Sequence, residues 1–205
     1  MITIISAQTT YERANVTSTA TALVVFAHPQ THLSRFNRPL AEAARAVPGV
    51  TVHDLYNAYP DFYIDVRAEQ ARLAAVDIVV FLHPIQWYSM PALLKEWVDM
   101  VLLPGWVYGE HGHALDGKTY WLVATTGSPA EAYQAGGAQG RPFDDYLHAF
   151  RQTARLCRMH WAPPLILHGA HQSDAAALEA HLQAFLARLG QLLEHPPTDQ
   201  APNGT

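Results

Sequence analysis

Short apolar runs alternate along the chain with segments in which apolar residues recur every three or four positions. The runs are rich in Val, Ile and Leu, which is typical of strands buried on both faces of a parallel sheet. The segments between them have the spacing of helices with one buried face. This pattern predicts strands over residues 21–27, 50–55, 76–82, 119–125 and 162–168. It also predicts one helix that begins at a Ser34 cap and four further helices over residues 66–75, 92–103, 143–160 and 174–194.

Five strands that alternate with helices predict the α/β class, with a doubly wound parallel sheet covered by helices on both faces. The loops after the first, third and fourth strands are unusual, because they combine polar and aromatic residues. In the flavodoxin-like strand order 2-1-3-4-5, these three loops lie side by side at the carboxyl edge of the sheet, where FMN binds. We therefore expect a ligand at that edge.

The composition is that of a globular domain with a large core, since 49% of the 205 residues are hydrophobic and 15% are charged. We expect an N-terminal extension over residues 1–20, one flavodoxin-like domain over residues 21–194 and a flexible tail over residues 195–205. The net charge is −5 and no basic run exceeds one residue, which argues against a nucleic-acid partner.

The sequence favours a cytoplasmic location. Cys157 is the single cysteine, so a reducing compartment is the simpler interpretation. Residues 1–20 lack the basic start, apolar block and cleavage site of a signal peptide. No apolar stretch reaches the roughly 18 residues that a membrane span requires, so any membrane association would be peripheral and through a partner.

The loop after the first strand has the residues of an anion site. Ser34 opens a predicted helix, whose N–H groups and positive dipole end suit a phosphate. Asn37 and His28 lie beside that helix start, and Arg35 and Phe36 complete the segment. An ordinary helix cap explains Ser34 equally well.

The loops after the third and fourth strands suit a flat ring. Backbone groups of residues 85–88 can bond the N5 and O4 edge of a flavin, beside the Trp87 ring, and residues 125–128 offer hydroxyl and N–H groups to its N1 and O2 end. Buried aromatics in one turn and a plain glycine turn in the other remain the alternatives. The residues concerned are Ile85, Gln86, Trp87, Tyr88, Thr125, Thr126, Gly127 and Ser128.

Two irregular segments, residues 103–118 and 130–142, are long enough to be functional. Their aromatic residues Trp106, Tyr108 and Tyr133 are candidates for the walls of a substrate pocket, although plain packing explains each of them as well. The histidine pairs His111-x-His113 and His168-x-x-His171 lack a supporting carboxylate or cysteine, so a metal site is not favoured. A hydrolase is not favoured either, because Gly127-Ser128 lacks the second glycine of a nucleophile elbow.

Several motifs together carry a resemblance to a known family over roughly residues 21–190. They are His28-Pro29, Ser34-Arg35-Phe36-Asn37, Tyr59-Pro60-Asp61-Phe62, His83-Pro84-Ile85-Gln86-Trp87-Tyr88, Pro91-Ala92-Leu93-Leu94-Lys95, Gly105-Trp106-Val107-Tyr108-Gly109 and Thr125-Thr126-Gly127. In these motifs the chain resembles the flavodoxin-fold NAD(P)H:quinone oxidoreductases. Among them it is similar to the KefF-like ancillary flavoprotein of the glutathione-regulated potassium-efflux system.

The resemblance implies a homodimer that holds FMN, or alternatively FAD, at its interface. It implies hydride transfer from NAD(P)H to flavin N5 and then to a quinone, the reaction of an NAD(P)H dehydrogenase (quinone). The alternative is a regulatory flavoprotein that switches a membrane potassium-efflux transporter and in which quinone turnover is secondary. A third class, a purely structural module, predicts a colourless protein.

The chain departs from the resemblance after the third loop. Quinone reductases of the mammalian type have a Tyr and a His there, which handle the proton of the reduced ring. Tyr133 can stand for the Tyr and is the candidate catalytic residue, but residues 134–141 contain no His. Ser128-Pro129 also replaces the further glycines that usually follow Thr-Thr-Gly.

Overall fold

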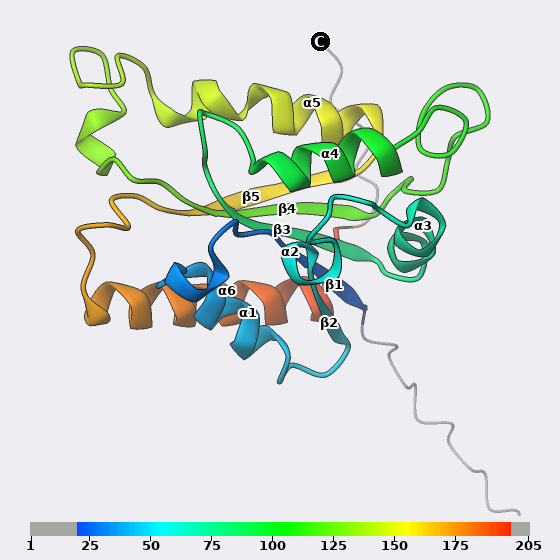
Figure 1. The fold of residues 1–205 in the computed structure, drawn as a ribbon, viewed down its shortest axis with the longest axis horizontal. Coiled ribbons are helices and arrows are strands. Elements are labelled where there is room, and N and C mark those ends of the chain that lie inside the picture. Colours follow the sequence, from blue (N-terminus) through cyan, green and yellow to red (C-terminus); the bar gives the residue numbers. More distant parts are fainter. Residues whose placement is uncertain (1–19, 198–205) are drawn as a thin grey trace, which may run out of the picture.

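The computed structural model describes residues 20–197, which form a five-stranded parallel sheet with helices on both faces (Figure 1). The strand order is β2-β1-β3-β4-β5, so the predicted fold class and strand order are confirmed. The strands are β1 (Ala22–Phe26), β2 (Val50–Asp54), β3 (Ile78–Pro84), β4 (Thr119–Thr125) and β5 (His160–Leu167). The helices are α1 (Asn37–Ala44), α2 (Leu55–Ala58), α3 (Val66–Ala74), α4 (Ala92–Val101), α5 (His148–Leu156) and α6 (Ala175–Glu194), with 3-10 turns η1 (Thr31–Leu33), η2 (Ala130–Ala132) and η3 (Phe143–Leu147).

The predicted N-terminal extension lies outside the described residues except for Ala20, and so does the predicted tail from residue 198 onward. Within the described range, no helix is both long and apolar enough to cross a membrane.

The apolar runs produce two cores, one on each face of the sheet. Leu23 and Val25 of β1 pack in the core under α3, α4 and α5, whereas Val24 and Phe26 pack in the core over α1 and α6. Every residue of β1 is buried, as expected of a strand between two helical layers. Figure 1 shows α1 and α6 on one side of the sheet and α4 and α5 on the other.

The first helix begins later than predicted. The 3-10 turn η1 comes first, so that Ser34 donates its backbone N–H to Thr31 and α1 starts at Asn37 with Phe36 at the N-cap position. Ser34 still serves the helix end, because its Oγ accepts the backbone N–H of Arg38 at 3.1 Å. The prediction of Ser34 as the N-cap was therefore wrong in position, but its hydroxyl does satisfy a free N–H group.

The region around the last strand also differs from its prediction. Where a helix over residues 143–160 was predicted, a 3-10 turn is followed by α5, which ends at Leu156 with Cys157 as its C-cap. Arg158 then takes a positive φ of 53°. The strand then starts at His160 and keeps Pro163 and Pro164 inside it. Proline lacks an N–H group, and β5 tolerates two of them because it is an edge strand with a register shift beside Trp121.

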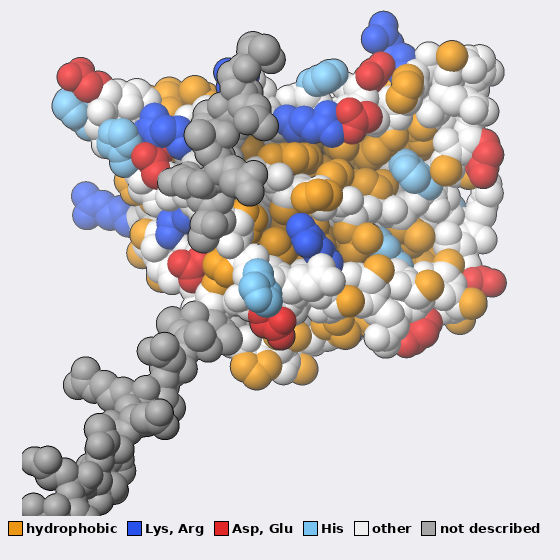
Figure 2. Space-filling model, turned by 180° about the vertical axis from the view of Figure 1, so that it is seen from behind, with side chains coloured by type: hydrophobic (Ala, Val, Ile, Leu, Met, Phe, Trp, Pro, Cys, Tyr) orange, Lys and Arg blue, Asp and Glu red, His pale blue; other side chains and the backbone are white. Residues whose placement is uncertain are grey.

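The outer side of β5 is only half-buried, with Trp161, Leu165 and Ile166 partly exposed. Figure 2 shows the molecule from behind, where hydrophobic side chains gather across the middle of the surface and most charged ones lie toward its margins.

The strands end level with one another at the carboxyl edge. Pro84 of β3 pairs with Thr125 of β4, which in turn pairs with Leu167 of β5. Beside them, the N–H of Ala27 donates to the carbonyl of Leu82. The loops that follow β1, β3, β4 and β5 therefore leave the sheet at one edge, as predicted for the first three.

A buried carboxylate joins three elements on the α4 face. Glu69 of α3 is fully buried, and its Oε1 accepts from the Tyr59 hydroxyl at 2.6 Å while its Oε2 accepts from Trp97 Nε1 at 2.9 Å. His53 Nε2 lies 3.0 Å from the same Oε1, and Arg72 Nε lies 3.3 Å from it. Burial alone would raise the pKa of Glu69, but the contacts from His53, Tyr59 and Trp97 outweigh it and lower the pKa below its ordinary value.

His83, near the end of β3, is a second buried titratable group. Its ring stacks on Phe150 of α5 at 5.8 Å, and its Nδ1 lies 2.9 Å from the carbonyl of Pro84, to which it donates. Its Nε2 has no partner among the described residues. Full burial lowers the pKa of His83 from 6.5 to about 4, so the folded protein holds the ring neutral.

This pKa predicts a stability that falls with acidification. The unfolded chain takes up a proton at His83 below about pH 6.5 and the folded one does not, so acid favours unfolding. Between pH 7.5 and pH 5 the wild type should lose about 2 kcal/mol more unfolding free energy than His83→Asn. Urea unfolding at a series of pH values measures this difference. An equal change of unfolding free energy with pH in the wild type and in His83→Asn would contradict this expectation.

Candidate functional site

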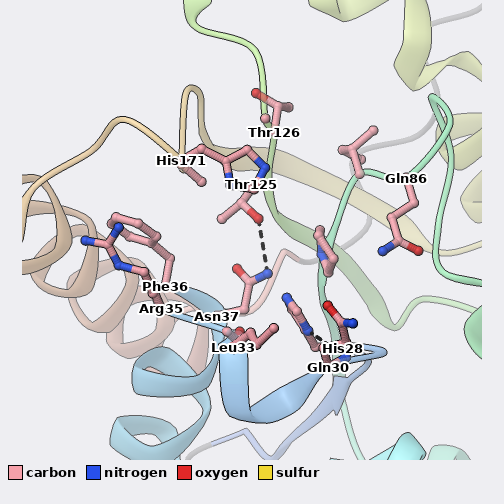
Figure 3. A pocket seen from close by; sticks show the side chains of 15 residues that line it. His28, Gln30, Leu33, Arg35, Phe36, Asn37, Gln86, Thr125, Thr126 and His171 are labelled. Carbon is pink, nitrogen blue, oxygen red and sulfur yellow. Dashed lines mark hydrogen bonds between the residues drawn. The ribbon is translucent and has the colours of Figure 1, made fainter.

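A cavity of about 290 Å³ lies at the carboxyl edge of the sheet, between the loops that follow β1, β3, β4 and β5 (Figure 3). No Asp or Glu is among the residues that line it. Most predicted flavin contacts meet there, together with residues that were not predicted. The lining residues are His28, Gln30, Leu33, Ser34, Arg35, Phe36, Asn37, Pro84, Ile85, Gln86, Thr125, Thr126, Gly127, Ala170 and His171.

Asn37 links the loops after β1 and β4, and one of its side-chain atoms has no hydrogen bond among the described residues. Its side chain is buried, and its Nδ2 donates to Thr125 Oγ1 at 3.2 Å across 88 residues of sequence. Its Oδ1 is buried and has no partner among the described residues. Figure 3 shows the amide between Thr125 and the first loop. A buried acceptor without a donor is costly, so a hydroxyl or N–H group of a ligand would stabilise it.

The first loop is held by its own hydrogen bonds. The N–H of Gln30 donates to His28 Nδ1 at 3.2 Å, and the Thr31 hydroxyl donates to the carbonyl of His28. Burial lowers the pKa of His28, so its ring tends to stay neutral and able to accept. This loop therefore presents the start of α1 and a fixed imidazole to the cavity.

The second loop brings Ile85 and Gln86 to the cavity but holds Trp87 and Tyr88 outside its lining. The N–H of Ile85 donates to Thr125, and Gln86 exchanges backbone bonds with Ser89. Trp87 and Tyr88 have positive φ angles of 47° and 63°, a conformation that costs about 1 kcal/mol or more for such residues. The Trp87 side chain is 93% exposed, and the Tyr88 ring stacks on Tyr146 at 5.0 Å.

The third loop is tied to a histidine that the sequence did not single out for this site. Thr126 Oγ1 donates to the carbonyl of Ser128 at 2.8 Å, so its 3.0 Å contact with His168 Nδ1 requires that His168 donate. The ring of Tyr133 lies 5.0 Å from that of His168. Residues 134–141, which follow Tyr133 in the sequence, contain no histidine. In the structure His168, directly after β5, takes a place beside Tyr133. Ser128 lies outside the cavity lining and accepts from Gln139.

The loop after β5 forms a wall that sequence reasoning missed. Ala170 and His171 line the cavity, and the N–H of Ala170 donates to the carbonyl of Thr126 at 2.9 Å. The His171 ring lies so close to Gly127 that a Cβ there would be 3.2 Å from its Cδ2. The available signal was the histidine pair 168 and 171, which was considered only for metal binding.

Trp106 and Tyr108 do not reach the cavity of their own chain. They belong to the segment between the end of α4 and the start of β4, at the amino-terminal edge of the sheet (Figure 1). Both are partly buried against the core on the α4 face. The structure therefore separates these two candidate substrate residues from the flavin candidates.

The sequence of this chain matches a family model described as a flavodoxin-like fold over residues 20–190. The chain belongs to this flavodoxin-like family. A curated relative, the KefG ancillary protein of the glutathione-regulated potassium-efflux system of Yersinia enterocolitica, is 47% identical and covers 80% of this chain and 89% of its own. The resemblance expected from the motifs is thus confirmed.

Two solved structures are also similar to this chain. General stress protein 14 of Treponema denticola, in complex with FMN, has a TM-score of 0.79 at 38% identity and covers 84% of this chain and 99% of its own. An NADPH-quinone reductase from P. pentosaceus has a TM-score of 0.73 at 30% identity and covers 86% of this chain and 99% of its own.

The residues of the cavity fit a flavin. The Oδ1 of Asn37 has no hydrogen-bond donor among the described residues, and the hydroxyl groups of a ribityl chain would supply one. The guanidinium group of Arg35, in a lining without a carboxylate, suits a phosphate. The lining thus offers candidate partners for the ribityl and phosphate groups of a flavin.

Proposed function

We propose that this chain is a flavin-dependent NAD(P)H:quinone oxidoreductase. The observation that carries the proposal is the cavity at the carboxyl edge, whose lining has no carboxylate and includes Asn37, the buried Oδ1 of which has no partner among the described residues. A flavin bound there would take a hydride from NAD(P)H at N5 and pass it to a quinone, by two alternating steps. The similarity to an NADPH-quinone reductase at 30% identity supports this reaction class.

The residues of the chain would bind and orient the ring. Asn37 and the start of α1 would hold the ribityl and phosphate groups, and Thr126 would be held toward the pyrimidine end by His168. The N–H groups of residues 85 and 86 are already used in internal bonds, so those of Trp87 and Tyr88 are the better donors to the ring edge. Tyr133, beside His168, is the candidate for handling a proton there.

We further propose a homodimer. Trp106 and Tyr108 lie at the edge of the sheet opposite the cavity of their own chain. If they wall the quinone site, as their aromatic character suggests, they do so in a second copy. The exposed Trp87 ring, next to the cavity, would then be covered by the bound ring or the partner.

A regulatory role is the second candidate function. Curated relatives at 43–47% identity are named as ancillary proteins of a potassium-efflux system. In this role the flavin site would be the same, and its occupancy would switch a membrane transporter. The protein would reach the membrane as a peripheral subunit of that partner.

The functional test separates these candidates. The full-length chain is incubated with FMN, freed of excess flavin and assayed for NADH and NADPH oxidation with a simple benzoquinone. Quinone-dependent oxidation above the rate of free FMN is expected. Bound flavin without turnover would favour the regulatory role, and failure to retain any flavin would refute both.

Trp87→Ala should weaken flavin retention and lower quinone turnover, each by about 5-fold. The Trp87 side chain is 93% exposed, so its removal should not disturb the fold. Leu156→Ala, also at an exposed apolar position but at the far end of α5, is the control and should leave both properties unchanged. Equal retention and turnover in Trp87→Ala and the wild type would remove Trp87 from the site.

A further inference from the structure

The loop after β3 contains a tight two-residue turn. The N–H of Gln86 donates to the carbonyl of Ser89 at 3.1 Å, and the N–H of Ser89 donates back to the carbonyl of Gln86 at 3.0 Å. The loop is therefore a minimal hairpin with Trp87 and Tyr88 at its tip. Both tip residues have positive φ angles, which a type I′ turn requires at its two central positions. Asn and Gly usually occupy such positions, because bulky side chains disfavour this backbone conformation.

The hairpin tip has an aromatic partner on a distant element. The Tyr88 ring stacks on the ring of Tyr146 in the 3-10 turn η3, with the centroids 5.0 Å apart and an angle of 20° between the planes. The Trp87 side chain is 93% exposed and adds little packing to the tip. Stacked aromatic pairs stabilise the arrangement that brings them together, so Tyr146 favours the disfavoured backbone conformation of the tip.

Tyr146 is itself held by the segment that follows β4. Its hydroxyl donates to the carbonyl of Gln139 at 2.8 Å, and Gln139 Nε2 donates to Ser128 Oγ at 3.0 Å. The ring of Tyr133 lies edge-on to that of Tyr146, with the centroids 6.1 Å apart. The hairpin after β3 is thus linked through Tyr146 to the third loop of the site.

The hairpin tip carries hydrogen-bond donors that the fold does not use. Among residues 20–197, the N–H groups of Trp87 and Tyr88 have no acceptor. The residues just before them, Ile85 and Gln86, line the cavity. The direction of the two N–H groups depends on the backbone angles of the tip, and a return to negative φ would turn these peptide groups. A contact that fixes the tip conformation therefore also fixes the direction of its donors.

We propose that Tyr146 is a positioning residue, whose stack on Tyr88 keeps the hairpin tip in the conformation that presents its N–H groups to the N5 edge of a bound flavin ring. The inference rests on the proposed function and adds a residue that lies outside the cavity lining. The donors are then in place before the ligand arrives. Donors fixed in this way favour a ring that has an acceptor at N5 over a ring of the same shape without one.

Amide hydrogen exchange in the flavin-free, full-length chain tests the first half of this proposal. Tyr146→Ala should speed the exchange of the Gln86 and Ser89 amides about 5-fold or more, because these groups are protected only while the hairpin is closed. Tyr146→Phe keeps the stacked ring and should stay within about 3-fold of the wild type. Glycine adopts positive φ without a stack, so in a Tyr88→Gly background Tyr146→Ala should change the exchange by less than about 2-fold.

A comparison of FMN with 5-deaza-FMN tests the second half. The two have the same shape, but 5-deaza-FMN has a C–H group in place of the acceptor N5. Equilibrium dialysis with the wild type should show FMN bound about 10-fold more tightly. Tyr146→Ala should weaken FMN binding about 5-fold and 5-deaza-FMN binding by less than about 2-fold, so that most of the preference disappears. Tyr146→Phe should keep the preference.

The outcomes separate the role of Tyr146 from the flavin proposal. Exchange that is unchanged in Tyr146→Ala would show that the stack does not hold the hairpin. Equal losses for FMN and 5-deaza-FMN would show a merely structural role. Either result overturns the positioning role and leaves the flavin site standing. If the wild type binds neither flavin, the proposed function fails and the positioning role fails with it.

Discussion

Asn37→Asp should weaken FMN binding at least 100-fold, which corresponds to about 2.7 kcal/mol. The substitution keeps the shape of the side chain, and the Thr125 hydroxyl can donate to the new carboxylate in place of accepting from the amide. The change adds one negative charge to a cavity that otherwise has no acidic lining. Like charges in a partly buried site repel by a few kcal/mol, and the phosphate of FMN would be held against this charge.

Riboflavin binding distinguishes the effect of the charge added at residue 37 from any effect of a changed side-chain shape. It lacks the phosphate, so Asn37→Asp should weaken its binding by less than 10-fold. Gln152→Glu makes the same amide-to-carboxylate change on the exposed face of α5 and should leave FMN binding within 2-fold of the wild type. An FMN affinity unchanged by Asn37→Asp would show that the cavity does not hold the phosphate.

Glu69→Ala should reduce the free energy of unfolding by about 4 kcal/mol. The carboxylate is fully buried and accepts hydrogen bonds from Tyr59 and Trp97, so its loss leaves the buried Trp97 indole N–H and the partly buried Tyr59 hydroxyl without this acceptor. The substitution also opens a void between α3 and α4. Urea unfolding at neutral pH, followed by far-UV circular dichroism, measures the change.

Two further variants define what Glu69 contributes. Glu69→Gln keeps an acceptor for Trp97 but removes the charge, and should lose about half as much stability as Glu69→Ala. Glu179→Ala removes a carboxylate from the exposed face of α6, where its hydrogen bond among the described residues is from Gln183. This change should alter stability by less than about 0.5 kcal/mol. A loss below about 1 kcal/mol for Glu69→Ala would mean that the network is not a stabilising element.

The alternation of apolar runs was sufficient to predict the sheet, because a parallel strand buried on both faces has few ways to appear in sequence. Asp65 and Asp174 stand at the starts of α3 and α6, where each accepts a backbone N–H three residues on. The boundaries around residues 31–37 and 157–164 were not predictable in the same way. There the chain uses a 3-10 turn, a positive φ at Arg158 and prolines in an edge strand, all of which depend on tertiary packing.

The sequence could place a site residue only where the loop that carries it directly follows a predicted strand. Asn37, Gln86 and Thr126 could be placed at the carboxyl edge from the order of the elements alone. His168 and His171 could not, because their proximity to Thr126 and Gly127 arises from the pairing of β4 with the edge strand β5. The outward position of Trp87 depends on two consecutive positive φ angles, which no spacing of residues reveals.

A titration with FMN tests whether the cavity between the four loops is a flavin site. FMN is added to the full-length protein freed of flavin, and the quenching of its fluorescence is followed to saturation. We expect one FMN to bind per chain with a Kd of about 1 μM or below, and FMN analogues that keep the phosphate to compete with it. Absence of saturable quenching with the folded wild type would contradict it.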